Sequence, residues 1–197
     1  HCQALAQPSA NKDKIALVMK ALSNPFFSKM AAGAKEYARE NGVTLEVFGT
    51  EMETDIEHQT GIINNLIDRG YGALVIAPAD SRKLAPTLKK AVEQGIVVIN
   101  IDNPLDRDAQ TQYNLTLPFV GSDNAKGAAL IGDYIRHQLH GKGRGIVIEG
   151  ANGARNGELC KAGFLQAVTK DSAIQIVASV SANWHTEDAF TQGNRAM

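Results

Sequence analysis

The sequence predicts an α/β protein built on parallel sheets, and two observations carry this prediction. Apolar runs typical of strands alternate along the chain with segments whose apolar residues recur at helical spacing. Several of these runs are nearly continuous Val, Ile and Leu, as expected for strands buried on both faces of a parallel sheet. Right-handed crossovers would then place helices on both sides of the sheet. We expect five strands before residue 121 and two after it.

The predicted strands cover residues 14–20, 43–49, 73–77, 96–101, 118–121, 145–149 and 174–181. The predicted helices cover residues 25–41, 55–69, 81–94, 124–140 and 157–170. In the first helix, Asn24 stands at the N-cap, Pro25 suits the first helical position and Gly42 suits a left-handed C-terminal residue. Its apolar stripe is formed by Phe27, Met30, Ala31, Ala34 and Ala38. The longest segment without either pattern, residues 103–117, is predicted to be a loop.

Composition narrows the possible functions. A net charge of −1 gives no electrostatic case for nucleic acid or an anionic membrane as a partner. No apolar run approaches the roughly 18 residues that a membrane-spanning helix needs. The two cysteines, Cys2 and Cys160, are too few for a disulfide framework. His137 and His140 could share a metal, but with no third ligand in sight a solvated helix face is favoured.

Catalytic signatures are missing from the sequence. It contains no Gly-x-Gly-x-x-Gly after a strand, no phosphate-binding loop, no Gly-x-Ser-x-Gly and no His-Glu-x-x-His. We therefore expect a protein that is not an enzyme and needs no cofactor.

The first residues suggest export. Ala4-Leu5-Ala6 before Gln7 resembles the cleavage site that ends a secretory signal, so residues 1–12 are predicted to be a signal remnant or N-terminal tail. The alternative is an unstructured tail that happens to contain two alanines. The first interpretation predicts a periplasmic location.

Polar and aromatic residues follow several predicted strands, where ligands bind in open α/β sheets. Carboxylates and amides can pair with the hydroxyl edges of a sugar, and aromatic rings can cover its apolar faces. Burying a hydroxyl without a partner costs about 1–3 kcal/mol, so a polyol site needs many such groups. The candidates are Asn24, Phe26, Phe27, Asp80, Asp102, Asn103, Asn156 and Trp184.

Several candidates have a structural alternative. Asn24 and Asp80 could simply cap helices, and Phe27 lies on the apolar stripe and so could belong to the core. Phe26, at the edge of that stripe, is the better pocket candidate. Asp102 is the hardest to explain structurally, because a carboxylate at a buried strand end needs a partner.

A family resemblance adds to these patterns. Ile15-Ala-Leu-Val18 followed by Ser23-Asn-Pro-Phe-Phe27 resembles the opening of ribose-type periplasmic binding proteins, the sugar-binding components of ABC importers. The resemblance extends from about residue 13 to the end. Further matching segments, in family order, are Ala79-Asp80, Val98-Ile-Asn-Ile-Asp102, Val120-Gly-Ser-Asp-Asn124, Gly132-Asp-Tyr-Ile135, Gly163-Phe164 and Asn183-Trp184.

The resemblance implies two Rossmann-like lobes with parallel sheets, residues 13–121 and a partial second lobe of residues 122–197, that close on one monosaccharide or polyol. It implies permease subunits of an ABC transporter as partners. Trp184 would cover the sugar, and Lys20 would also touch it. The residues that would face the ligand are Asn24, Phe26, Asp102, Asn103 and Asn156.

Two departures from the family pattern argue against ribose as the ligand. Cys160 stands where the family usually has an arginine, and Asn103 follows Asp102 where ribose binders usually have an arginine. The chain also stops at Met197, inside the helix expected after the seventh strand. We therefore expect an incomplete second lobe, weak or absent ligand binding, and association through exposed apolar faces.

Three other functions stay open on sequence grounds. A sugar-responsive transcription repressor has the same fold, but it would begin with a DNA-reading helix pair. A periplasmic sensor would dock on a histidine kinase instead of a permease. An enzyme on the same fold is the third alternative, which fold alone does not exclude.

Overall fold

The structure is a computed structural model that describes residues 12–197. The predicted cleavage motif Ala4-Leu5-Ala6 and Cys2 lie outside the described residues. The chain divides into two compact units. The first comprises the residues up to Ile101 together with Leu105–Val120, and the second comprises Asp102–Pro104 together with Gly121–Met197.

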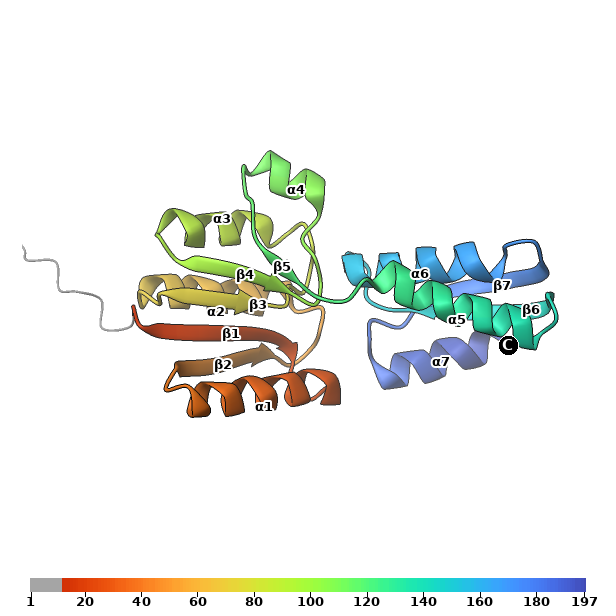
Figure 1. The fold of residues 1–197 in the computed structure, drawn as a ribbon, viewed down its shortest axis with the longest axis horizontal. Coiled ribbons are helices and arrows are strands. Elements are labelled where there is room, and N and C mark those ends of the chain that lie inside the picture. The colour runs from red at the N-terminus through yellow and green to blue at the C-terminus, as the bar shows by residue number, and fades with distance from the viewer. Residues whose placement is uncertain (1–11) are drawn as a thin grey trace, which may run out of the picture. The chain divides into compact units, whose positions relative to one another are not determined.

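The first unit is a five-stranded, fully parallel sheet with the order β2-β1-β3-β4-β5 (Figure 1). Its strands are β1 (Lys14–Ala21), β2 (Thr44–Thr50), β3 (Ala73–Ile76), β4 (Val97–Ile101) and β5 (Phe119–Val120). Its helices are α1 (Pro25–Glu40), α2 (Ile56–Asp68), α3 (Ala85–Glu93) and α4 (Arg107–Gln112). The predicted five strands before residue 121 are confirmed.

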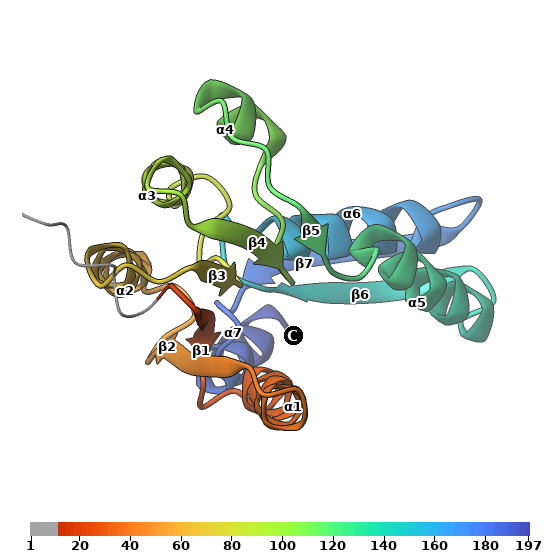
Figure 2. The same ribbon diagram turned by 60° about the vertical axis from the view of Figure 1, so that its left-hand side comes forward.

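The alternation of side chains along β1 divides the core of the first unit into two clusters. Ala16 and Val18 pack in the cluster that contains Leu66 of α2 and Leu88 of α3. Leu17 and Met19 pack in the cluster that contains Phe27 and Ala31 of α1. Figure 2 shows α1 on the opposite side of the sheet from α2 and α3, as right-handed crossovers require.

Two predictions for the first unit were wrong in detail. Helix α3 begins at Ala85 instead of residue 81, because an earlier start would bring Pro86 past the first turn, where its missing N–H would break the helix. The predicted loop 103–117 contains α4. The carboxylate of Asp106 caps this helix by accepting the N–H groups of Asp108 and Ala109, each at 3.1 Å.

The second unit contains a two-stranded parallel sheet and three helices. The strands are β6 (Lys142–Glu149) and β7 (Ala173–Ser181), and the helices are α5 (Asn124–Gln138), α6 (Arg155–Val168) and α7 (Thr186–Ala196). Helices α5 and α6 approach closely at two glycines. A Cβ atom added to Gly163 would lie 2.0 Å from the carbonyl oxygen of Ala125, and one added to Gly132 would lie 2.7 Å from that of Phe164.

Candidate functional site

A buried polar cluster lies at the carboxyl ends of β1 and β2. Lys20, which is only 1% exposed, has its ammonium 3.8 Å from Oε2 of Glu53, itself 7% exposed. Oε1 of Glu53 accepts a hydrogen bond from Nδ2 of Asn24 at 2.6 Å. Oδ1 of Asn24 accepts the N–H of Phe26 at 3.0 Å and so caps α1. Glu53, which lies 29 residues after Asn24 in the sequence, thus contacts both Lys20 and Asn24.

The two phenylalanines beside this cluster differ in burial. Phe27 is 2% exposed and packs in the core, whereas Phe26 is 54% exposed. Their rings meet edge to face with centroids 5.1 Å apart, and the Lys20 ammonium lies 5.7 Å from the Phe27 centroid. The buried Phe27 ring therefore packs against the Lys20 ammonium. The exposed Phe26 ring offers an aromatic face on which a sugar could stack.

Asp80 follows β3 and is nearly buried. Its Oδ1 accepts the N–H groups of Arg82 and Lys83, each at 2.8 Å, so it caps the turn that precedes α3. The helix-capping alternative for Asp80 was therefore wrong in detail, because the N-cap of α3 is Leu84 and Asp80 caps only the turn before it.

Gln59 of α2 ties the ends of two strands together and is completely buried. Its Nε2 donates to the carbonyl oxygens of Met19 at 3.2 Å and Ala77 at 2.9 Å, and its Oε1 accepts the N–H of Ala79 at 2.7 Å. These bonds hold the backbone immediately before Lys20 and Asp80 in place.

In the second unit, Asp102, Asn103 and Asn156 come together. The fully buried Asn103 accepts the N–H of Asn156 through Oδ1 at 3.0 Å. Nδ2 of Asn156 lies 3.5 Å from Oδ2 of Asp102. These bonds explain why residues 102–104 group with the second unit although they follow β4 directly. Asp102 has a positive φ of 59°. Among residues other than glycine, aspartate and asparagine tolerate this left-handed conformation best.

Trp184 is 42% exposed and has a φ of 61°, which is rare for a bulky residue. Its ring lies against the backbone at the end of β6, where a Cβ atom added to Gly150 would come within 2.2 Å of it. Gly157 of α6 has the same ring 3.5 Å from its ideal Cβ position. Gly150 therefore makes room for Trp184, whereas a Cβ at Gly157 would be in ordinary van der Waals contact with the ring. An unfavourable backbone conformation orients the Trp184 side chain.

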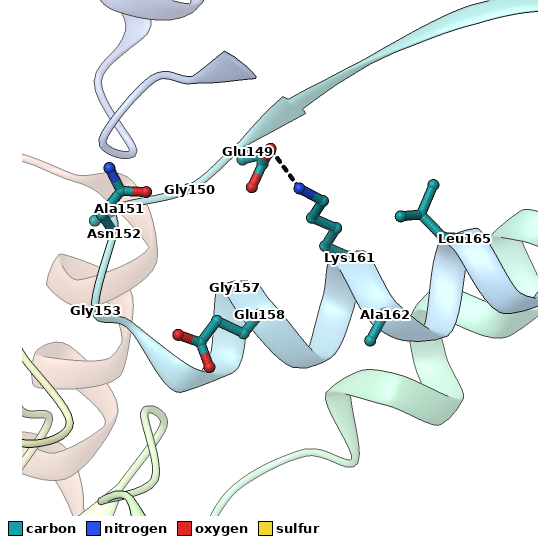
Figure 3. Close-up of a pocket in the computed structure, with 10 residues that line it drawn as sticks. All are labelled: Glu149, Gly150, Ala151, Asn152, Gly153, Gly157, Glu158, Lys161, Ala162 and Leu165. Carbon is teal, nitrogen blue, oxygen red and sulfur yellow. Dashed lines mark hydrogen bonds and ion pairs between the residues drawn. The ribbon is translucent and has the colours of Figure 1, made fainter. Parts of the chain in front are cut away.

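A hollow of about 360 Å³ opens at the end of β6 and along α6 (Figure 3). The ammonium of Lys161 lies 2.8 Å from Oε1 of Glu149, and the hydroxyl of Ser179 donates to the same oxygen. Lys161 and then Ser179 lower the pKa of the Glu149 carboxyl below its ordinary value. In contrast, partial burial and then the nearby charge of Asp102 raise the pKa of the Cys160 thiol, which disfavours a reactive thiolate.

The structure thus brings the sequence-predicted residues into two groups. Lys20, Asn24, Phe26 and Phe27 gather around Glu53 in the first unit, and Asp102, Asn103 and Asn156 gather in the second. Glu53 and Gln59 were missed by sequence reasoning. Glu53 follows the second predicted strand, and the sequence candidates include no residue after that strand.

Residues 12–197 contain no group of three or more His, Cys, Asp or Glu side chains that could hold a metal ion, so His137 and His140 gain no third ligand there. Within the same residues, no helix has the length and apolar character needed to cross a membrane.

Comparison with known proteins identifies sugar-binding relatives. A relative from Pseudomonas aeruginosa named D-ribose/D-allose-binding protein is 41% identical over 186 residues, which are 93% of this chain and 58% of that protein. A D-allose-binding periplasmic protein from Escherichia coli is 33% identical and matches 86% of this chain and 55% of its own length. This chain thus spans less than two thirds of the length of either relative.

A solved structure with bound D-allose also matches. It is an ABC transporter periplasmic solute-binding protein from Actinobacillus succinogenes, 37% identical, with a TM-score of 0.85 over 92% of this chain and 64% of that one. The model of the periplasmic binding protein domain matches residues 15–197. The chain therefore belongs to the periplasmic binding protein domain family.

Proposed function

We propose that this chain belongs to the solute-binding component of an ABC importer and that it binds a monosaccharide or polyol in the periplasm. The proposal is carried by the 41% identity to a D-ribose/D-allose-binding protein over 93% of the chain. The name of that relative and the D-allose bound to the Actinobacillus succinogenes protein favour a neutral aldose as the ligand.

The ligand-contacting residues that we propose come from both units. In the first unit they are Asn24 and the exposed ring of Phe26, with Lys20, Phe27 and Asp80 close to the same strand ends. In the second unit they are Asp102, Asn103, Asn156 and Trp184. Amide and carboxylate groups at these positions would pair with sugar hydroxyls, and the two exposed rings would cover C–H faces.

We further propose that the protein binds its ligand without transforming it and passes it to the membrane subunits of a permease. Supporting this, the model of the periplasmic binding protein domain matches residues 15–197. The raised pKa of Cys160 disfavours the one cysteine of the described residues as a nucleophile.

Sugar titrations test the proposal. Thermal shift and calorimetry with D-allose, D-ribose and myo-inositol should show one sugar that raises the melting temperature, because a ligand of the folded state stabilises it by mass action. NMR titration at high sugar concentration extends the measurement to weak binding. The absence of any sugar response would contradict the proposal.

Variants locate the site. Asp102→Asn should weaken the affinity by about tenfold, because a charged acceptor contributes roughly 1.5–3 kcal/mol to a hydrogen bond. Asp133→Asn, on the exposed face of α5, is the matched control and should leave the affinity unchanged. An equal effect of both substitutions would contradict the placement of the site. Co-purification with permease subunits, and not with a histidine kinase, would separate the importer from the sensor.

A further inference from the structure

The buried cluster of Lys20, Asn24 and Glu53 carries an inference beyond sugar binding in general. We propose that Glu53 sets the charge preference of the site: it balances Lys20, so that the site selects uncharged sugars over acidic sugars such as uronates. This inference rests on the proposed function. Glu53 is here a positioning residue, since it acts on the ligand through Lys20 and Asn24.

The charges of both Lys20 and Glu53 are buried. Lys20 is 1% and Glu53 is 7% exposed, and their charged atoms are 3.8 Å apart. Burial of a charge is strongly unfavourable unless an opposite charge compensates it. The pair therefore enters the fold as a neutral unit at the carboxyl ends of β1 and β2.

A closed chain of contacts surrounds the Lys20–Glu53 pair. Glu53 accepts from Asn24, Asn24 caps the N–H of Phe26, the Phe26 ring meets Phe27, and the Phe27 ring lies beneath the Lys20 ammonium. A change at Glu53 is thus transmitted to Asn24 and Phe26, the residues proposed to contact the sugar. Its side chain also fixes which way the Asn24 amide points.

The charge of Glu53 can act on a ligand at a distance. A unit charge in a poorly solvated region acts over several ångströms, because little water screens it. Replacing Glu53 by glutamine keeps the shape and an oxygen that can accept from Asn24. It adds one unit of positive charge to the cluster, and a carboxylate on the ligand would then be attracted more strongly than before.

The test measures the ratio of affinities for D-allose and for D-glucuronate or D-galacturonate by NMR titration of the 197-residue chain. The unmodified protein should prefer D-allose. In Glu53→Gln the ratio should shift toward the uronates by about tenfold, the effect of one poorly screened charge. The double variant Lys20→Met with Glu53→Gln should return the ratio close to its original value, because it restores neutrality.

Glu51→Gln is the matched control, since it removes an exposed carboxylate two residues from Glu53 and should leave the ratio unchanged. An unchanged ratio in Glu53→Gln, with sugar binding intact, would overturn the inference and leave the proposed function standing. If the unmodified protein binds none of the sugars, the proposed function is overturned, and this inference with it.

The pairing of Lys20 with Glu53 can also be tested without sugar, by thermal unfolding, if one variant folds poorly. The melting temperatures of the two single variants and the double variant form a thermodynamic cycle. The double variant should be more stable than Glu53→Gln alone, since it no longer buries a lysine that has lost the Glu53 charge. Additive losses of stability would overturn the pairing of Lys20 with Glu53.

Discussion

The two units hold their polar residues in different ways. In the first unit, Lys20, Glu53 and Gln59 are at most 7% exposed, and each is fixed by partners on a different element. In the second unit, Asn103 is fully buried, whereas Asp102 and Asn156 are only partly buried. The first group is fixed by the core, while the second group depends mainly on mutual hydrogen bonds.

The hydrophobic core of the first unit also buries its side chains more completely than the core of the second unit does. Side chains from α1, α2 and α3 cover both faces of the β1 region in the first unit. In the second unit, α5 leaves Leu130, Ile131 and Tyr134 more than half exposed, and its tightest packing is at glycines that face α6. Side-chain burial therefore contributes more to the stability of the first unit, and close backbone contact contributes more to that of the second. Four pairs of substitutions test this difference.

The largest expected effect is on side-chain burial. Leu66→Ala, in the core of the first unit at 1% exposure, should lower the free energy of unfolding by about 3 kcal/mol through lost burial and a cavity. Leu130→Ala, in the second unit at 66% exposure, should change it by less than about 0.5 kcal/mol. Urea unfolding followed by circular dichroism measures both. Similar losses of unfolding free energy in the two variants would contradict this difference between the units.

Trp184 makes that measurement specific, because it is the single tryptophan of the chain and lies in the second unit. Its fluorescence transition reports the second unit, while circular dichroism reports both. A Leu66→Ala shift in circular dichroism that exceeds the shift in fluorescence would show that the two units unfold separately.

Backbone contact in the second unit is tested at Gly163. Its Cβ would lie 2.0 Å from the Ala125 carbonyl oxygen, so Gly163→Ala must push α5 and α6 apart and should cost about 2–3 kcal/mol. Gly127→Ala is the control on α5, where nothing lies within 4 Å of the added atom. It should stabilise the protein by about 0.5–1 kcal/mol, because alanine favours helix. Loss of stability in the control would show that the contacts at Gly163 are not the cause.

Polar fixation in the first unit is tested at Gln59. Gln59→Met keeps the volume but removes three hydrogen bonds to Met19, Ala77 and Ala79, and should cost about 1–3 kcal/mol because buried backbone groups lose their partner. Gln138→Met, on the exposed end of α5, should have no measurable effect. Thermal unfolding measures both. An effect of Gln59→Met no larger than its control would contradict the role of the Gln59 hydrogen bonds in stabilising the first unit.

The smallest expected effect is at helix caps. Asp106 accepts two backbone N–H groups at α4, whereas Asp123 accepts one at α5. Asp106→Ala should lower the free energy of unfolding by about 1 kcal/mol at neutral pH. Asp123→Ala should lower it by about half of that, near the lower end of the range for substitutions of N-cap residues by alanine. Chemical unfolding of the two variants at pH 7 compares them, and a larger loss for Asp123→Ala would contradict the order.

The Asp106 effect should also depend on pH. The Ala109 N–H and then Arg82 hold the pKa of Asp106 below its ordinary value, although partial burial opposes this. A carboxyl with a lowered pKa in the folded state stabilises the fold above its unfolded pKa, about 3.9, and loses that contribution as pH falls through its folded pKa. The difference between the unmodified protein and Asp106→Ala should therefore shrink below about pH 4. A difference that grows with acidity would contradict this sign.

The sequence by itself determined the order of strands and helices, the parallel sheets, and the capping of α1 by Asn24, because periodicity and caps are local properties. Local signals were less decisive for α4: its N-cap Asp106 was present in a segment interpreted as a loop. The predicted start of α3 was also wrong, since Pro86 was not weighed against a helix beginning at residue 81.

Only the tertiary structure decided which polar residues meet. Glu53 reaches Asn24 across 29 residues, Gln59 reaches Met19 across 40, and Asn156 reaches Asn103 across 53. Such contacts depend on how crossovers bring distant strand ends to one edge of a sheet and on how far each side chain is buried. Neither is encoded in the spacing of neighbouring residues, so the pairing of Lys20 with Glu53 became visible only in the folded chain.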